Sequence, residues 1–361
     1  MEDLTMKANV NKQIKLNNAL IKLKNRLPIH RANRSFENTL KEEFEVFNEL
    51  LSKIDESDLQ KIFSSDSSPI IKALTKRRLQ NFIVKIQQTL LKITQEYYKG
   101  YPGNAFNLLY KLLKENKFAP KRDRLKATSA KRYIDDEYGN YFTIKMQCEF
   151  MSFYRMRMSD DNLTKEELFH IPFEKREIVS TARFSIPGFP CLYLGTSLEV
   201  CWNEIGRSLN GKERVFACKY KNYKPLAFLN LTIPQGFRNG GFDNNTFDIL
   251  RFLITYPFYS ACLIKVEFPN SPFKPEYVIP QLLLQYVKQE DFLDGIIYSS
   301  TKDKSKNNEN FHNVVIPTID ITDSGHCNQL KKWYYSSDVK VINPNNLNSD
   351  IFALCSVSKI R

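Results

Sequence analysis

Long hydrophobic runs are missing from this sequence of 361 residues. No stretch of about 18 uninterrupted apolar residues occurs, so we expect no membrane-spanning helix. The first fifteen residues, MEDLTMKANVNKQIK, also lack the hydrophobic region of a signal peptide. The sequence therefore predicts a soluble, cytoplasmic protein.

Metal-binding and nucleotide-binding motifs are missing as well. The seven cysteines are widely scattered without a Cys-x-x-Cys pair, and the four histidines have no zinc-ligand spacing. We therefore expect no metal, and we expect the cysteines to be buried free thiols of a reducing compartment. Neither G-x-G-x-x-G nor a P-loop occurs, so nothing supports a Rossmann or Walker phosphate site.

Apolar and aromatic residues, in contrast, are plentiful. Hydrophobic residues make up 42% of the chain, with 26 Phe and 18 Tyr. This composition is sufficient for a core and excludes a wholly disordered chain. The length is comfortable for two domains.

The net charge of +13 is confined to the first third of the chain. Residues 1–132 contain 27 Lys and Arg against 14 Asp and Glu, whereas the rest contains 26 of each. Such an asymmetry marks a boundary between structural units. We therefore predict a basic domain over residues 1–132, a second domain over 145–325, and a C-terminal extension, 326–361, that packs on the second domain.

The basic domain has the pattern of amphipathic helices, with apolar residues spaced by three or four. One stripe follows the cap residue Ser35, a second ends near Gly100, and a third spans residues 105–113. The first two stripes consist of Phe36, Leu40, Phe44, Phe47, Leu51 and Ile54, and of Ile71, Leu74, Phe82, Ile86, Leu90, Ile93 and Tyr97. We expect these stripes to pack on each other in an all-α unit.

Basic residues fill the gaps between the stripes, notably Lys76-Arg77-Arg78. A basic patch can bind nucleic acid by neutralising phosphates. No helix-turn-helix, zinc-finger or RNA-binding signature accompanies the charge, so a solvated face or a docking surface for an acidic partner is favoured over nucleic acid.

The second part of the chain mixes short strands and helices. Ser197 is expected to cap a helix that runs to about Ser208, and a helix over 280–289 has proline at its first position. Strand composition is found at residues 191–194, 215–220, 226–232 and 295–298. Because no regular strand–helix–strand rhythm occurs, the pattern favours an α+β fold over a doubly wound sheet.

Two arginines and a glutamate of this part carry the candidate chemistry. Arg155 and Arg183 could each grip a diphosphate, since a guanidinium presents fixed donors to phosphate oxygens. Arg157 is the alternative to Arg155, and structural ion pairing is the alternative role for each. Glu204 lies at the edge of the apolar face of its helix, where a carboxylate could stabilise cationic charge as a glycosidic bond breaks. Its alternative role is that of a solvated helix residue.

Three segments, in this order, resemble the RES domain family over roughly residues 150–320. The family pattern has an aromatic-Arg pair, then Arg-Phe, Gly and Leu-Tyr-Leu, then Glu about eleven residues beyond the Tyr, and a late Asp-Gly-Ile-x-Tyr-x-Ser. The matching residues are Tyr154-Arg155, Arg183-Phe184, Gly188, Leu192-Tyr193-Leu194, Glu204 and Asp294 to Ser300. Ser299 stands where the family often has proline, which leaves Ser299 and Ser300 as alternatives. The polar segment 302–310 is longer than the family leads us to expect and predicts a surface loop.

The resemblance implies a fold like that of the ADP-ribosyltransferases and an enzyme that cleaves NAD at the nicotinamide–ribose bond. Water or inorganic phosphate would be the acceptor. By position, Arg155 and Arg183 would bind the NAD phosphates. Tyr193, for which the alternative is a core role, would line the nicotinamide-ribose pocket. Glu204 would hold a ribose hydroxyl and favour an oxocarbenium-like transition state, and Ser300 would complete the pocket.

The family also implies partners and alternatives. Its members are toxins of toxin–antitoxin pairs, so an antitoxin or regulatory protein is a candidate partner for the basic helices. A mono-ADP-ribosyltransferase acting on a macromolecule would use the same pocket, and a non-catalytic nucleic-acid-binding module would use the basic helices instead. The sequence leaves open which acceptor is used and whether the chain forms a homo-oligomer.

Overall fold

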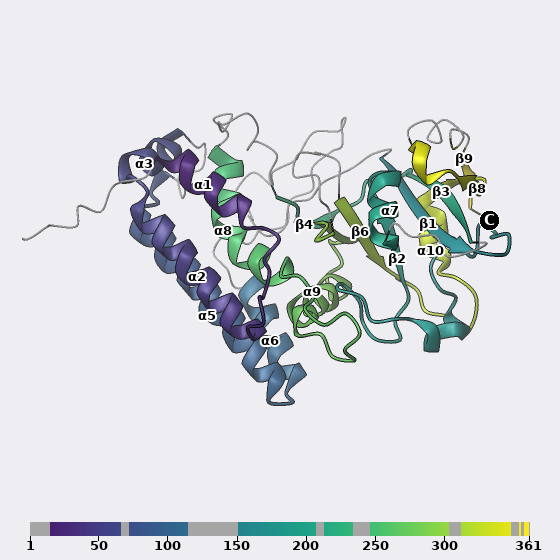
Figure 1. Ribbon diagram of the computed structural model, residues 1–361, viewed down its shortest axis with the longest axis horizontal. Helices are drawn as coiled ribbons and strands as arrows, with labels where there is room; N and C mark the ends of the chain where they lie inside the picture. The colour runs from purple at the N-terminus through teal and green to yellow at the C-terminus, as the bar shows by residue number, and fades with distance from the viewer. Residues whose placement is uncertain are drawn as a thin grey trace, which may run out of the picture.

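The structure is a computed structural model, and it describes residues 15–65, 72–114, 151–206, 213–233, 246–302, 312–347, 354 and 357–360. An N-terminal helical region leads into a mixed sheet with helices packed around it, so the α+β prediction is confirmed. Figure 1 shows the helical region at one end and the sheet at the other, with α8 and α9 between them. No helix among the described residues is long and apolar enough to cross a membrane.

The N-terminal helices are α1 (Leu16–Asn25), α2 (Phe36–Lys53), α3 (Glu56–Ser65), α5 (Lys76–Tyr98) and α6 (Pro102–Lys114). Three of them, α2, α5 and α6, follow the predicted apolar stripes, whereas α1 and α3 were not predicted. The hydroxyl of Ser35 accepts a hydrogen bond from the Asn38 backbone N–H and thereby caps α2, as predicted. α5 ends just before Gly100, whose φ of +85° a side chain would disfavour. Ile71 lies outside the described residues.

One hydrophobic core extends from these helices towards the sheet. At its centre lies α8 (Thr246–Cys262), which packs against α2, α3, α5 and α9 (Val278–Gln289). The ring of Tyr256 on α8 stacks on Phe47, with centroids 4.8 Å apart, and its hydroxyl donates to Glu43 at 2.6 Å. The sequence patterns did not predict α8, because this nearly all-apolar helix has no polar face to give it a helical period. The domain boundaries stay a prediction.

The remaining helices are short. α7 (Leu198–Ile205) is capped by Ser197 as predicted, but it ends before the predicted Ser208, because Gly206 adopts a φ of +102°. α9 begins two residues before the proline expected at its first position. The other helical segments are η1 (Phe173–Ile178), η3 (Pro275–Tyr277), η4 (Pro344–Asn346) and α10 (Asn328–Trp333).

Nine described strands form one sheet, in the order β4-β5-β6-β2-β1-β3-β7-β9, with β8 also paired to β3. Only β4 and β5 are parallel to each other among these pairs. The strands are β1 (Ser152–Ser159), β2 (Cys191–Gly195), β3 (Arg214–Asn222), β4 (Phe228–Leu231), β5 (Gly295–Ser299), β6 (His312–Pro317), β7 (Tyr334–Ser337), β8 (Lys340–Ile342) and β9 (Val357–Lys359). The four strand predictions correspond to β2, β3, β4 and β5.

The sheet opens between its two central strands. β1 follows β3 through eight register positions, from Ser152 to Ser159, but it pairs with β2 at a single position, Tyr154 opposite Gly195. β1 and β2 therefore diverge beyond this pair. The divergence leaves room within the sheet that side chains or a ligand must fill.

The Asp294-Gly295 pair of the late motif has a structural role. The Asp294 carboxylate accepts hydrogen bonds from the Ala227 backbone N–H at 2.7 Å and from Lys224 at 3.1 Å, which joins the starts of β4 and β5. A Cβ at Gly295 would lie 2.4 Å from the Val315 carbonyl oxygen. Only glycine therefore allows β6 to approach this closely.

The described cysteines fit the predicted chemistry of buried thiols. Cys191, Cys201, Cys218, Cys262 and Cys327 are all free and buried. Burial raises the pKa of Cys191, Cys201 and Cys262 to about 12, which makes these thiols poor nucleophiles. Cys148 and Cys355 lie outside the described residues.

The buried side chain of His170 should make the stability of the fold sensitive to acid. The Nε2 of His170 accepts a hydrogen bond from the Cys327 backbone N–H at 2.8 Å, and its Nδ1 lies 2.7 Å from the Ile171 carbonyl oxygen. Burial lowers the pKa of His170 from 6.5 to about 4. Between about pH 6.5 and 4 the unfolded chain therefore binds a proton that the folded chain does not bind. We expect the free energy of unfolding to fall by about 3 kcal/mol between pH 6.5 and 4, with no further loss from this group below pH 4.

Urea unfolding between pH 7 and pH 4.5 measures this effect. His170→Gln keeps an acceptor for the Cys327 N–H and removes the titrating group, so its stability should depend less steeply on pH than that of the wild type. Equal slopes for the two proteins would show that His170 does not titrate as described.

Candidate active site

A cavity of about 880 Å³ lies where β1 and β2 diverge. This volume is within the range of small-molecule binding pockets. Its walls come from β1, β2, β5, β6, α7 and the segment after α8. The residues whose side chains carry the argument below are Arg155, Arg183, Tyr193, Glu204, Tyr277, Tyr298, Asn313 and the lysines Lys265, Lys274 and Lys302.

Glu204 is held in place by two hydrogen bonds to one of its oxygens. Its Oε1 accepts from the Ser300 hydroxyl at 2.6 Å and from the Asn313 side-chain amide at 2.7 Å. Its Oε2 lies 3.6 Å from the Lys302 ammonium, which also donates to the Glu204 backbone carbonyl. The side chain of Glu204 is 35% exposed, so a fixed carboxylate with one less engaged oxygen borders the cavity.

Ser300 and Ser299 have different partners. Ser300 donates to Glu204, whereas the Ser299 hydroxyl accepts from the Ile233 backbone N–H at 3.3 Å, in the segment that follows β4. The structure thus brings Ser300, the residue favoured by position, into the site beside Glu204. The predicted surface loop, apart from Lys302, lies outside the described residues.

Arg183 is fixed by two contacts in the wall of the cavity. Its Nη1 donates to the Cys262 carbonyl oxygen at 2.8 Å, and its guanidinium carbon lies 5.3 Å from the centre of the Tyr277 ring. Burial lowers the pKa of Arg183, although an arginine still carries its charge at neutral pH. Both contacts leave other guanidinium donors for an anion.

Arg155 lines the same cavity from β1, at the point where the strands diverge. Its Nη1 is buried and has no hydrogen-bond partner among the described residues. Burial lowers the pKa of Arg155, because desolvation disfavours the charged form. Arg157, the alternative from the sequence, is exposed and donates to the Glu167 carbonyl oxygen at 2.7 Å. The geometry therefore favours Arg155 as the residue that lacks an anionic partner.

Tyr193 orders the aromatic side of the cavity. Its hydroxyl donates to the Phe184 carbonyl oxygen at 2.9 Å, and the Phe184 ring lies 4.3 Å from that of Tyr298, centre to centre. Burial raises the pKa values of both tyrosines, so both hydroxyls stay neutral. Tyr193 therefore lines the cavity and also supports the Arg183-Phe184 motif.

The charges around the cavity are one-sided. Among the described lining residues, Glu204 is the single carboxylate, whereas Arg155, Arg183, Lys265, Lys274 and Lys302 are cations. Such a lining attracts anions and strengthens their binding where water is partly excluded. The cavity therefore suits a ligand that carries negative charge.

Several lining residues were not among the predicted site residues. Asn313 is on β6, opposite Tyr298 on β5, and Lys265 and Lys274 flank a loop after the unpredicted α8. A polar asparagine beside the apolar run of residues 314–316 is the signal that could have identified Asn313. No sequence pattern marked the two lysines as cavity residues, because their position at the cavity depends on where α8 places the loop.

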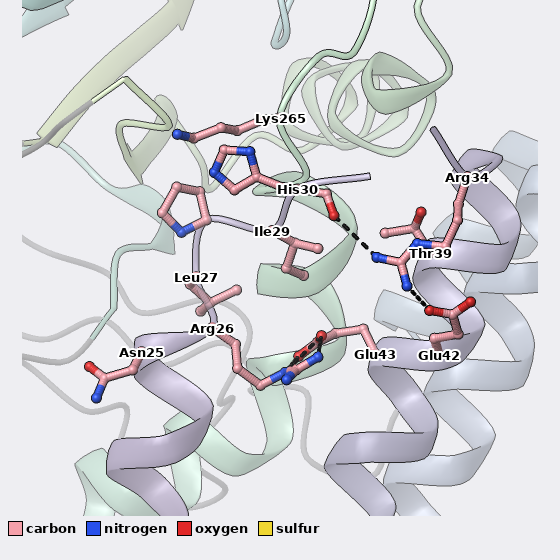
Figure 2. A pocket seen from close by; sticks show the side chains of 11 residues that line it. Asn25, Arg26, Leu27, Ile29, His30, Arg34, Thr39, Glu42, Glu43 and Lys265 are labelled. Atoms are coloured by element: carbon pink, nitrogen blue, oxygen red, sulfur yellow. Dashed lines mark hydrogen bonds and ion pairs between the residues drawn. The ribbon is translucent and has the colours of Figure 1, made fainter. Parts of the chain in front are cut away.

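A second pocket, of about 470 Å³, lies between the α1–α2 loop and the segment after α8 (Figure 2). Its arginines already have anionic partners: Arg26 makes a two-pronged ion pair with Glu43, and Arg34 pairs with Glu42. This arrangement leaves less positive charge for a ligand than the large cavity offers.

The fold and the site define an α+β protein whose cavity is lined by cationic side chains and one fixed carboxylate. Residues 153–327 match the family model described as "RES domain", so the resemblance that the motifs predicted is confirmed for this part of the chain. The chain is 40% identical over 215 residues to the protein named "Putative toxin YopC" of Bacillus subtilis (strain 168), a match that covers 55% of this chain and 47% of that protein. The matched region thus spans about half the length of the curated relative. No solved structure matches the chain, so the likeness to ADP-ribosyltransferases stays a prediction.

Proposed function

We propose that the chain is an enzyme that consumes NAD by cleaving its nicotinamide–ribose bond. The observation that carries this proposal is Glu204, a carboxylate fixed by Ser300 and Asn313 on the wall of an otherwise cationic cavity. The resemblance to the RES family supplies the identity of the substrate, and the charge pattern agrees with a dinucleotide that carries a diphosphate.

Cleavage of this bond requires mainly that the protein position the substrate and place a negative charge near the ribose. Nicotinamide is already a cationic leaving group, so the ribose needs a nearby anion rather than a strong nucleophile. In the proposed complex, Arg155 and Arg183 bind the diphosphate, and Tyr193 lines the nicotinamide-ribose pocket. Glu204 holds a ribose hydroxyl through Oε2 and stabilises the developing oxocarbenium charge.

We also propose a toxin role for this activity. The relative is named as a toxin, and loss of NAD would stop the metabolism of a cell. The acceptor of the ADP-ribosyl group is water, inorganic phosphate or a macromolecule, and each leaves a different product.

Incubation of the purified full chain with labelled NAD tests the proposal. We expect release of nicotinamide, and the remaining label identifies the acceptor. Free ADP-ribose indicates water, a phosphorylated ADP-ribose that forms only with phosphate present indicates phosphorolysis, and label fixed on protein or nucleic acid indicates the transferase. The proposal would be contradicted if the folded wild type consumed no NAD under any of these conditions. Salt-sensitive nucleic-acid binding by the same inactive protein would then support the binding module.

We propose that an antitoxin or another acidic regulatory protein docks on α5. Lys85 and Lys92 lie exposed seven residues apart, hence on one side of this helix. Lys76 is less suitable for a test, because its ammonium donates to the Ser52 and Ile54 carbonyls and so caps α2. Reversing both charges, by Lys85→Glu with Lys92→Glu, should abolish co-purification of the partner. Unchanged co-purification would remove this surface from consideration.

A further inference from the structure

One wall of the cavity is made by residues 263–277, the segment between α8 and α9, which we call the wall segment. It lies within the residues that match the RES domain model, between Glu204 and the late motif that begins at Asp294. Its members that line the cavity are Lys265, Val266, Pro269, Lys274 and Tyr277.

The wall segment is attached to the N-terminal helical region through the loop between α1 and α2. The Ile29 backbone N–H donates to the Leu263 carbonyl at 3.0 Å, and the Lys265 backbone N–H donates to the Ile29 carbonyl at 2.8 Å. Figure 2 shows this loop passing beside α2, with His30 and Lys265 in the second pocket. A strand-like bridge therefore ties the start of the wall segment to residues that belong to no RES motif.

Charged groups make the second attachment. Arg31 Nη1 lies 2.7 Å from Glu276 Oε1, and these side chains are only 10% and 1% exposed. The same loop reaches Glu267, whose carboxylate accepts from the Asn33 backbone N–H at 3.1 Å. The Glu267 backbone N–H in turn lies 3.3 Å from Glu276 Oε1. Removal of Arg31 would leave the Glu276 charge buried without its counter-ion, which forces the neighbouring chain to rearrange.

The two contacts that hold Arg183 come from the two ends of this wall. Its guanidinium donates to the carbonyl of Cys262, one residue before the wall segment begins, and faces the ring of Tyr277, its last residue. Glu276, the partner of Arg31, directly precedes Tyr277. A shift of Glu276 therefore moves the surface against which Arg183 is oriented.

We propose that Arg31 is a positioning residue for the cavity. By holding Glu276, it fixes the wall segment and with it the orientation of Tyr277 and Arg183 towards the anionic part of the substrate. The choice of substrate rests on the proposed function. The N-terminal helical region then helps to shape the substrate site, although Arg31 itself does not line the cavity.

Arg31→Gln in the full chain tests the proposal, and Arg26→Gln is its matched control. Arg26 makes another ion pair between the same loop and a buried carboxylate, that of Glu43, which is 2% exposed and belongs to α2 rather than to the wall segment. We expect Arg31→Gln to raise KM for NAD and Kd for ADP-ribose about tenfold, with kcat changed less than about twofold, since the displaced group binds rather than reacts. Amide hydrogen exchange should accelerate in residues 263–277. Arg26→Gln should lower Tm but leave these quantities unchanged.

Arg31→Lys separates the charge from the fold. Lysine keeps a cation for Glu276, so this variant should recover most of the affinity for ADP-ribose. If Arg31→Gln does not fold, the same measurements are made on Arg31→Lys. Unchanged affinity and unchanged exchange in the folded Arg31→Gln protein would overturn the proposal, as would equal effects in Arg26→Gln. If the wild type proves not to consume NAD, the proposed function fails on its own. Exchange in residues 263–277 then still decides whether Arg31 holds the wall.

Discussion

Replacing Glu204 by glutamine should lower kcat for NAD consumption by about 10²–10³-fold or more, the scale of losing one fixed electrostatic group in an active site. Glutamine has nearly the same shape and can still accept from Ser300 and Asn313, so the helix and cavity should persist. What disappears is the negative charge beside the ribose at the moment when positive charge develops there. KM for NAD and Kd for ADP-ribose should change little, since in the proposed complex the cations of the cavity bind both ligands.

The matched control for this prediction is Glu199→Gln. Glu199 lies on the same helix, α7, but does not line the cavity, so its variant should retain kcat. Steady-state kinetics and calorimetric binding of ADP-ribose measure the two quantities separately. Retained turnover in Glu204→Gln would remove the charge of Glu204 from the mechanism. Equal losses in both variants would indicate damage to α7 rather than to the chemistry.

Arg155→Met should weaken ADP-ribose binding and at the same time stabilise the free protein. An ionic hydrogen bond to phosphate contributes about 1.5–3 kcal/mol, so its loss should raise Kd by roughly 10–100-fold. In the free protein, however, the Arg155 Nη1 is buried without a hydrogen-bond partner among the described residues. Methionine keeps the apolar stem and removes the buried charge, which should increase the free energy of unfolding by about 1–3 kcal/mol.

The opposite signs make this prediction specific. A structural arginine would show lower Tm with unchanged affinity, and a surface arginine would show neither change. Arg157→Met serves as the control, because Arg157 is two residues along the same strand and exposed. Calorimetry with ADP-ribose and thermal unfolding of the ligand-free proteins give both values. A lower Tm for Arg155→Met would mean that its guanidinium is satisfied within the protein.

Both arginines and the glutamate were identifiable from the sequence because they lie in short motifs with fixed local geometry. Ser197 caps α7 and so sets the rotation of Glu204 about the helix, and the strand around Tyr193 follows from its apolar run. Asn313 was not predicted as the partner of Glu204, because a contact between residues 109 apart in the chain depends on how β6 pairs with β2 and β5. Local sequence patterns do not specify the register in which distant strands pair.

The sequence by itself determined the amphipathic N-terminal helices, the α+β class and the RES motifs, since helical period, strand composition and motif spacing are local properties. Only the tertiary structure decided that β1 and β2 diverge into a cavity, that Ser300 rather than Ser299 meets Glu204, and that Arg31 holds the wall through Glu276. The last contact joins residues 245 apart, on a loop of the helical region and a turn before α9. Such a pair forms because residues 249–262 of α8 are buried between the helices and the sheet, and this packing brings the loop and the turn together.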